Sequence, residues 1–184
     1  GIFGSWAGCA DWGLATLDGE FGLSIQPVSG CSDTLLSGVR PTEGTWYHLA
    51  GTYDGNNASL YVDGVLTASG QVAADYQGTA AGVWIGGEVC CGAYFDGVVD
   101  EVRVWNAARQ ADGLQATMNA RLQGDEPGLL GYWPMEEGSG ATTADLTAPA
   151  RTGTLVGNAR WVPLGTSGSG SSPGLMAQYL LSIE

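Results

Sequence analysis

Hydrophobic and polar positions alternate in short runs along most of the chain, and turn residues separate the runs. Residues 46–53 (WYHLAGTY), 59–62 (SLYV) and 65–69 (VLTAS) are clear cases. Asp63-Gly64 joins the last two runs and is a two-residue hairpin signal, as is Asp18-Gly19 near the N-terminus. A period of two is typical of strands with one buried face, so the pattern predicts an all-β protein.

More apolar runs predict more strands, and they lie at residues 82–87, 97–105, 128–135, 152–157 and 159–163. One segment differs, because Leu114, Met118 and Leu122 repeat every four residues. We therefore expect a helix over residues 107–122, with Asn106 as its N-cap and with Gly124 and Pro127 ending it. Many short strands at regular spacing and one short helix predict a β-sandwich.

Composition and charge narrow the classes of function. The chain has 184 residues, of which 31 are glycine, and nineteen acids face six basic residues, all of them arginine, for a net charge of −13. Such a surface repels phosphate backbones and anionic lipids, which argues against nucleic-acid binding. No run of apolar residues is long enough to insert into a membrane.

The four cysteines indicate the compartment. Cys9, Cys31, Cys90 and Cys91 lack the spacing of a zinc site, so we expect disulfides and a secreted or cell-surface protein. Two pairings are open. Either Cys9 and Cys31 each bond one of the adjacent pair Cys90-Cys91, or Cys9 bonds Cys31 and the adjacent pair forms a strained bridge.

Three quoted stretches carry a family resemblance: GTWYHLAGTYDGNNASLYVDGVLTASG at 44–70, IGG at 85–87 and FDGVVDEVRVWNAAR at 95–109. They resemble the second half of a LamG-like domain, the jelly roll related to concanavalin A. The resemblance covers roughly residues 12–109 and implies a concanavalin A-like β-sandwich.

The resemblance also bears on domain organisation. The stretch GLLGYWPMEEGSGATTADLTAPARTGTLVG, at 128–157, resembles the segment that normally opens such a domain, so the order in this chain is unusual. We expect either one sandwich over 1–165, or the second half of a domain at 1–127 followed by an opening segment at 128–165. The chain is then a piece of a tandem array or a permuted domain.

Catalysis is not expected. His48 is the single histidine and has no serine or cysteine partner at a motif spacing, so we expect it to be a packed, hydrogen-bonded strand residue. The resemblance to glucanases of this fold class would imply the motif E-x-D-x-x-E on one strand. This chain lacks that motif. Asp100 and Glu101 should point to opposite faces of their strand, as should Glu136 and Glu137.

The resemblance implies a structural Ca²⁺ ion as the one possible cofactor. Asp100 matches the aspartate of the family's last-strand pattern, and Asp145 and Glu136 match acids of the opening segment. Ca²⁺ binds six to eight oxygen atoms, so these three side chains would need help from carbonyl groups. The alternative is that they are solvated acids on turns.

Exposed aromatic side chains at the rim of such a module can stack on sugars. Trp6, Trp12 and Tyr94 lie in glycine-rich stretches and are the candidates for glycan binding. The remaining tryptophans should lie in strands and in the core, and they are Trp46, Trp84, Trp105, Trp133 and Trp161. Asn57-Ala58-Ser59 is a sequon for N-glycosylation in a hairpin.

The tail divides into a Gly/Ser linker at 166–174 and a strand at 175–184. Leu175, Ala177, Tyr179, Leu181 and Ile183 alternate with less apolar residues. A lone strand is not stable, so this one should either dock at a sheet edge, with the edge of a neighbouring copy as one option, or begin the next domain.

Two functional hypotheses follow from these features. The first is a non-catalytic extracellular structural or assembly module, a subunit of a filament or surface array joined by strand exchange with copies of itself or with neighbouring domains. The alternative is an adhesion module that binds carbohydrate or protein. A glycosidase-like enzyme is a weak third.

Overall fold

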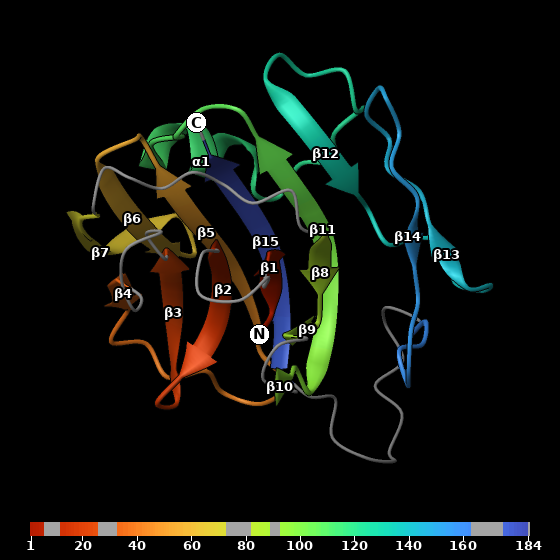
Figure 1. The fold of residues 1–184 in the computed structure, drawn as a ribbon, viewed down its shortest axis with the longest axis horizontal. Helices are drawn as coiled ribbons and strands as arrows, with labels where there is room; N and C mark the ends of the chain where they lie inside the picture. Colours follow the sequence, from red (N-terminus) through yellow and green to blue (C-terminus); the bar gives the residue numbers. More distant parts are fainter. Residues whose placement is uncertain (6–11, 26–32, 73–81, 89–92, 163–174, 184) are drawn as a thin grey trace.

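The computed structural model describes residues 1–5, 12–25, 33–72, 82–88, 93–162 and 175–183. Of residues 33, 93 and 175–183 it describes the backbone only. Two β-sheets face each other and form a sandwich, with one helix and a two-stranded arm outside it (Figure 1). The all-β sandwich expected from the alternating pattern is therefore confirmed.

The first sheet has five antiparallel strands in the order β4-β3-β2-β1-β8. Its strands are β1 (Phe3–Ser5), β2 (Trp12–Leu17), β3 (Glu20–Ile25), β4 (Asp33–Leu36) and β8 (Val83–Ile85). The hairpin predicted at Asp18-Gly19 joins β2 to β3, with φ angles of 51° and 80°. Positive φ at both positions is the type I′ geometry that an Asp-Gly pair favours.

The second sheet has six strands in the order β12-β11-β15-β5-β6-β7. Its strands are β5 (Trp46–Tyr53), β6 (Asn57–Val62), β7 (Val65–Gln71), β11 (Gly97–Trp105), β12 (Leu129–Trp133) and β15 (Leu175–Ile183). The predicted Asp63-Gly64 hairpin joins β6 to β7, again with positive φ at both residues.

Two small ribbons complete the strands. One pairs β9 (Gly87–Glu88) with β10 (Ala93–Tyr94), and the other pairs β13 (Thr142–Thr143) with β14 (Gly153–Thr154). The second ribbon stands beside the sandwich (Figure 1). The strand predicted over residues 159–163 is wrong for the described part, because residues 159–162 form no ladder.

The larger apolar cluster fills the space between the two sheets. Its fully buried members include Phe3, Leu14, Phe21, Leu49, Leu60 and Val102. Trp12 belongs to this cluster and meets the Phe3 ring edge-on, with 5.5 Å between ring centroids. Along β5, Tyr47, Leu49 and Tyr53 contact this cluster, as the period of two predicts.

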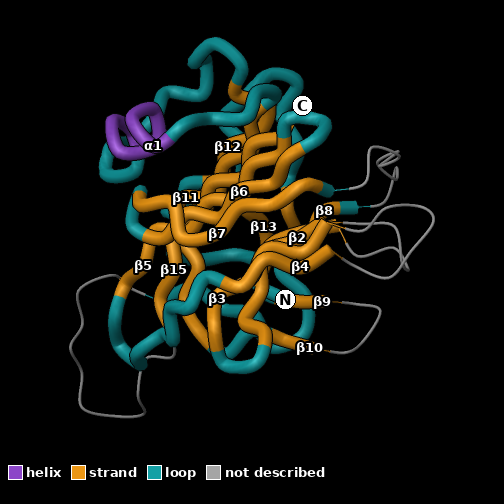
Figure 2. The backbone as a smooth tube through the Cα atoms, turned by 90° about the vertical axis from the view of Figure 1, so that its left-hand side faces the viewer, coloured by secondary structure: helices purple, strands orange, loops and turns teal. Residues whose placement is uncertain are grey.

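The helix α1 (Ala111–Thr117) lies against the outer face of the six-stranded sheet (Figure 2). It covers a second apolar cluster formed by Ala50, Tyr61, Trp105, Leu114, Leu122 and Tyr132.

The helix is shorter than the predicted 107–122, and Gln110 rather than Asn106 is its N-cap. Its early end has a physical cause: the Arg103 guanidinium takes the backbone carbonyls of Thr117 and Ala120 as hydrogen-bond acceptors.

The C-terminal strand β15 does not dock at a sheet edge. It lies inside the six-stranded sheet of its own chain, between β5 and β11 and parallel to both. The expectation of an edge position is wrong because a central position satisfies the backbone groups on both sides of the strand, whereas an edge position satisfies one side.

Candidate functional site

The space that β15 fills, between β5 and β11, is the feature on which strand exchange would depend, and we call it the strand slot. Met176 to Ile183 run in register with Trp46 to Tyr53 on one side. Leu175 to Ser182 pair with Gly97 to Trp105 on the other, with one register shift. Without β15 the sheet would divide into two parts, β12-β11 and β5-β6-β7, each with an unpaired inner edge.

Each residue of β15 lies in one row with its partners on β5 and β11, and these rows alternate between the buried and the outer face of the sheet as the tail residues alternate between apolar and less apolar. Tyr179 shares its register position with Leu49, which is fully buried in the cluster between the sheets. Gln178 lies in the row of His48 on β5 and Asp100 on β11, and both of these side chains belong to the outer face. A slip by one residue would exchange the apolar and polar rows, so the slot specifies the register of its occupant.

A β-bulge on β11 changes the expected geometry of the acids beside the slot. The ladder with β15 shifts between Asp100 and Arg103, and Glu101 between them has a φ angle of 55°. The extra residue brings Asp100 and Glu101 to one side of the strand, where both line a pocket of about 220 Å³. The expectation that these two carboxylates point to opposite faces is therefore wrong.

Glu101 is held in a buried polar network. It forms an ion pair with Arg103, which is only 2% exposed and lies 5.5 Å from the Tyr132 ring centroid. The Tyr132 hydroxyl donates to both carboxylate oxygens of Glu101. Burial, together with these contacts to Glu101, raises the pKa of Tyr132 to about 12. The network attaches β12 and the segment after α1 to β11.

Asp100 differs from the nearby acids Glu101 and Glu136 because none of the described cationic side chains forms an ion pair with it. Glu101 forms an ion pair with Arg103, and Glu136 forms one with Arg121. Burial, and then the nearby charge of Glu101, raises the pKa of Asp100 to about 6. Chemically, Asp100 can therefore hold a proton in mildly acidic solution.

His48 is a packed strand residue, as the sequence predicted, and it is 7% exposed. Its backbone N–H donates to Asp63, and its ring Nδ1 has no hydrogen-bond partner among the described residues. Burial, and then the charges of Arg103 and Arg109, lower its pKa to about 4. His48 is consequently neutral at physiological pH and a poor general base.

Comparison with known families agrees with this fold. A family model of the laminin G type, described as the concanavalin A-like lectin/glucanases superfamily, matches residues 9–115, which is more than half of the chain. The chain belongs to this family. Laminin G-like domains are generally binding modules without enzymatic activity and are typically extracellular. No curated protein and no solved structure matches the chain.

Within this laminin G-like fold, the three acids of the implied calcium site are not grouped together. Asp145 is 4% exposed, and its Oδ1 accepts hydrogen bonds from the Tyr132 N–H and from the N–H and hydroxyl of Thr147. Among the described residues, no three acidic, histidine or cysteine side chains are grouped to hold a metal ion. Asp100, Glu136 and Asp145 are thus not assembled into one site, and calcium binding stays a prediction.

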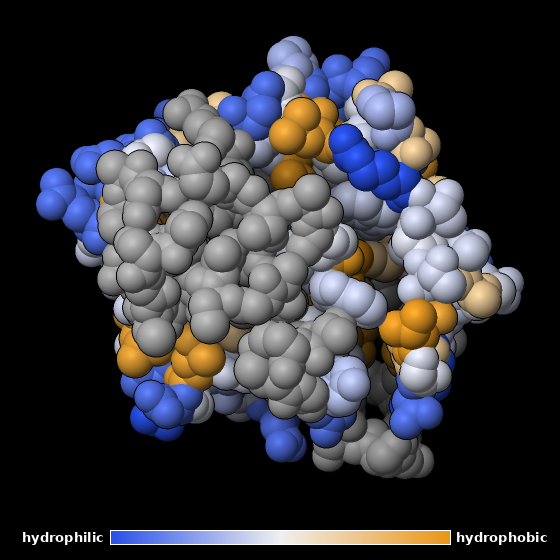
Figure 3. All heavy atoms as spheres, viewed as in Figure 1, coloured by the Kyte–Doolittle hydropathy of each residue, from blue (hydrophilic) through white to orange (hydrophobic). Residues whose placement is uncertain are grey.

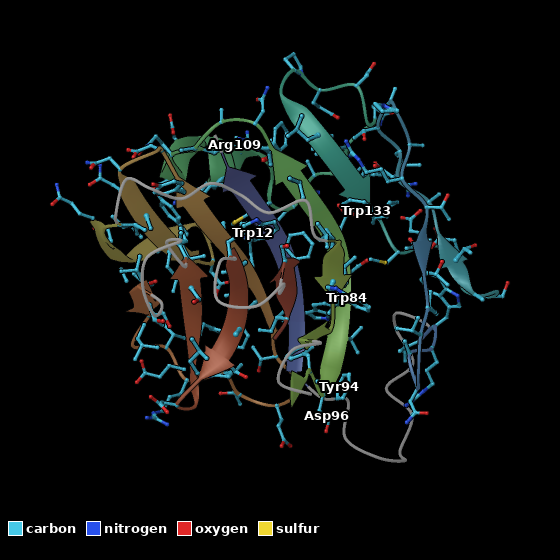
Figure 4. All side chains as sticks on the ribbon, viewed as in Figure 1. Trp12, Trp84, Tyr94, Asp96, Arg109 and Trp133 are labelled. Carbon is cyan, nitrogen blue, oxygen red and sulfur yellow. The ribbon has the colours of Figure 1, made fainter. Side chains whose placement is uncertain are left out.

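The division of the aromatic side chains of this laminin G-like domain into buried and exposed ones differs from the expectation. Trp12 is 9% exposed and lies in the core, so its predicted place at the rim is wrong. Tyr94 is 79% exposed and lies at the end of the sandwich, away from Trp12 (Figure 4). Trp46 and Trp84 are more than one-third exposed, which corrects their predicted core positions.

Of the other tryptophans, Trp105 and Trp133 are buried as expected. Trp161 is half-buried and lies outside any strand. On the face in Figure 3, the hydrophobic side chains of the described residues form separate groups among hydrophilic ones.

Several predicted residues lie outside the described residues, and they are Trp6, Cys9, Cys31, Cys90 and Cys91. The disulfides therefore stay a prediction. Asn57 is exposed at the start of β6, where its side-chain amide donates to Asp54, and its glycosylation also stays a prediction. None of the described helices is long and apolar enough to cross a membrane.

Sequence reasoning missed the strand slot and the Glu101–Arg103–Tyr132 network. The tail alternation indicated the strand, but the identity of its two neighbours depends on contacts distant in sequence. An arginine between apolar residues of a strand, as in the VRVW of residues 102–105, was the available signal for the buried network.

Proposed function

We propose that this chain is a non-catalytic, extracellular structural module that assembles with further copies by exchanging its C-terminal strand. One observation supports the proposal above the others: β15, the last strand of the chain, occupies the strand slot between β5 and β11. A strand in a central position contributes two ladders of backbone hydrogen bonds, so the fold depends on its last residues.

The connection to this strand is suited to exchange. Residues 166–174 read TSGSGSSPG, a composition typical of flexible linkers. A linker of this kind lets the same strand fill the slot of its own chain or that of a neighbour. Head-to-tail donation does not close on itself and therefore produces filaments.

The first experiment removes the strand. Protein truncated after Gly165 should melt at a lower temperature because its slot is empty, and it should not assemble by strand exchange because it has no tail to donate. A synthetic peptide of residues 173–184 should restore the melting temperature, while the same peptide with Tyr179→Asp should not, because residue 179 shares the row of buried Leu49. If the truncated protein melts and assembles like the full chain, strand donation is wrong.

A second experiment separates donation between copies from insertion within one chain. The full chain with Tyr179→Asp keeps a slot that its own tail fills poorly. Mixed with the wild-type chain carrying a mass tag, it should form a linked species that contains both. Mixed with tagged protein truncated after Gly165, it should form none, because neither partner has a tail to donate.

Tyr94 supports carbohydrate binding as a second candidate function. Its ring lies over the glycine-rich β9–β10 ribbon, where a Cβ on Gly87 would lie 3.3 Å from Cδ1 of the ring. An exposed ring fixed in this way can stack on a sugar face. Tyr94→Ala should abolish any signal on a glycan array, and Val156→Ala, which removes another exposed apolar side chain, should not.

A further inference from the structure

The inner rows of the strand slot do not fix the register of its occupant by themselves. They hold Leu175, Ala177, Tyr179, Leu181 and Ile183, which are all apolar, so a slip of the tail by two residues would keep apolar residues in these rows. Alternation therefore excludes a slip by one residue but not a slip by two. The place of β15 between β5 and β11 is seen in Figure 1, and its register needs a further determinant.

Buried polar atoms without partners gather along the outer face of the slot. Among the described residues, four have a buried side-chain nitrogen or oxygen atom without a hydrogen-bond partner, and three of these four border the slot: His48, Arg103 and Trp105. All three side chains are more than nine-tenths buried. Unpartnered polar atoms are rare in protein interiors, so their grouping here indicates that the slot requires polar groups from its occupant.

The row of residue 178 is the most polar row of the slot. Gln178 shares its register position with His48 on β5 and with Asp100 on β11. Neighbouring strands are about 4.8 Å apart, so position 178 alone lies between these two residues. Nδ1 of His48 has no partner among the described residues, and none of the described cations forms an ion pair with Asp100. A polar residue at 178, or a water molecule that it holds, can hydrogen-bond with both groups, and an apolar residue cannot.

The row of residue 182 has similar chemistry. Ser182 shares its register position with Thr52 on β5 and with Trp105 on β11. Both neighbours are buried, and Nε1 of Trp105 has no acceptor among the described residues. An indole N–H is a donor only, and a hydroxyl at position 182 has the acceptor that it lacks.

The row of residue 180, between these two, is more apolar. Leu180 shares its register position with Arg103 and with Ala50, which is fully buried in the apolar cluster under α1. Two nitrogen atoms of the Arg103 guanidinium already donate to the carbonyls of Thr117 and Ala120, and Nε is the one left without a partner. The contact with the cluster around Ala50 therefore favours an apolar residue in this row.

We infer that the strand slot selects its occupant by a polar–apolar–polar order at positions 178, 180 and 182, with Gln178 as the main specificity-determining residue. A slip by two residues would bring either Leu180 or Met176 into the row of His48, where neither can hydrogen-bond. The partner that fits is thus a second copy's tail, or another segment with this order. The inference rests on the proposed function in taking the tail as the strand that is exchanged.

The first test replaces one residue in the full chain. Gln178→Leu keeps the size of the side chain and removes its polarity, and Met176→Leu is the matched control in the next outer row. In an ordinary buried position leucine in place of glutamine adds apolar burial and raises the melting temperature. In the slot we expect Gln178→Leu to lower it by at least about 3 °C near neutral pH, and Met176→Leu to change it by less than about 2 °C.

A double-mutant cycle links this loss to the row of His48. In a chain that carries His48→Leu, the further change Gln178→Leu should lower the melting temperature by less than half as much, because the imidazole is gone. These measurements need no exchange between copies, since the tail fills a slot in either case. A Gln178→Leu chain that melts at or above the wild-type temperature, or an equal loss with and without His48, would overturn the inference.

Peptide binding separates this inference from strand exchange itself. Labelled peptides of residues 173–184 are added to the full chain with Tyr179→Asp, whose slot its own tail fills poorly. The Gln178→Leu peptide should bind at least about tenfold more weakly than the wild-type peptide, and the Met176→Leu peptide within about threefold of it. Equal binding of the wild-type and Gln178→Leu peptides contradicts the selection and leaves exchange intact. If no peptide binds while the melting results hold, exchange is wrong and the selection within the chain stands.

Discussion

The hydroxyl of Tyr132 lies 2.9 Å from Oε1 and 3.0 Å from Oε2 of Glu101. Tyr132 belongs to β12, beyond the part of the chain that the family model matches, and Glu101 lies on β11 within that part. The same hydroxyl accepts a hydrogen bond from the Leu122 N–H. One phenol therefore joins the bulge of β11, the strand β12 and the segment after α1.

Removing that hydroxyl should be costly. Tyr132→Phe leaves buried Glu101 with Arg103 as its remaining described partner, so we expect a loss of about 1–3 kcal/mol in the free energy of unfolding. Tyr61→Phe is the matched control, because Tyr61 lies in the same cluster and none of the described residues forms a hydrogen bond with its hydroxyl. Urea denaturation of both variants measures the difference. Equal losses would show that the Glu101 contact adds nothing.

Gly124 lies against the backbone of Leu146, a few residues after β13. It has a φ angle of +96°, and a Cβ there would lie 2.3 Å from the Leu146 carbonyl oxygen. Gly140 also has a positive φ, but a Cβ on it would meet nothing within 4 Å. Gly140→Ala should cost about 1 kcal/mol from backbone strain alone, and Gly124→Ala about 2 kcal/mol more, because a backbone carbonyl must move. Thermal or urea unfolding compares them, and similar losses would contradict the close contact.

Asp100 should make stability depend on pH. Its pKa of about 6 in the folded protein exceeds the ordinary value of 3.8, so the folded state binds a proton more tightly than the unfolded state. The contribution of Asp100 to the free energy of unfolding therefore rises as pH falls from about 6 to about 4. Asp100→Asn should be more stable than wild type at about pH 8, with a difference that shrinks on acidification.

Asp54→Asn is the control for this experiment, because the pH dependence of its effect on stability should have the opposite sign. The backbone N–H groups of Asn57 and Asn56 lower the pKa of Asp54, so its contribution to stability is lost as pH falls. Asp54→Asn should be less stable than wild type near neutral pH and should approach it in acid. If Asp100→Asn follows the same course as this control, the raised pKa of Asp100 is wrong.

His48 should oppose Asp100 in the same range of pH. Its pKa of about 4 lies below the ordinary 6.5, so between these pH values the unfolded chain binds a proton and the folded protein does not. The free energy of unfolding therefore falls as pH drops from about 6.5 to about 4. His48→Leu should remove this loss. Because the chain has one histidine, NMR can follow its imidazole signal directly. A transition near pH 6.5 in the folded protein would contradict the burial of His48.

The local hairpins could be predicted because a few neighbouring residues decide them. Asp18-Gly19 and Asp63-Gly64 adopt positive φ at both positions, which these residue types tolerate, and alternation on either side aligns the strands. The family resemblance then allowed the β-sandwich to be predicted as well. The short helix was predicted too long, because its end depends on Arg103, which precedes it in the chain and reaches its last carbonyls from β11.

The sequence by itself determined the all-β sandwich, its two Asp-Gly hairpins and the strand character of the tail, since periodicity and turn chemistry are local properties. Tertiary structure alone decided that β15 lies between β5 and β11 rather than at an edge. It also decided that a bulge brings Asp100 and Glu101 to one side, and that Trp12 is buried while Tyr94 is exposed. These features depend on which strands meet across long stretches of chain, and a register shift or a covering loop changes them without any change in the local pattern.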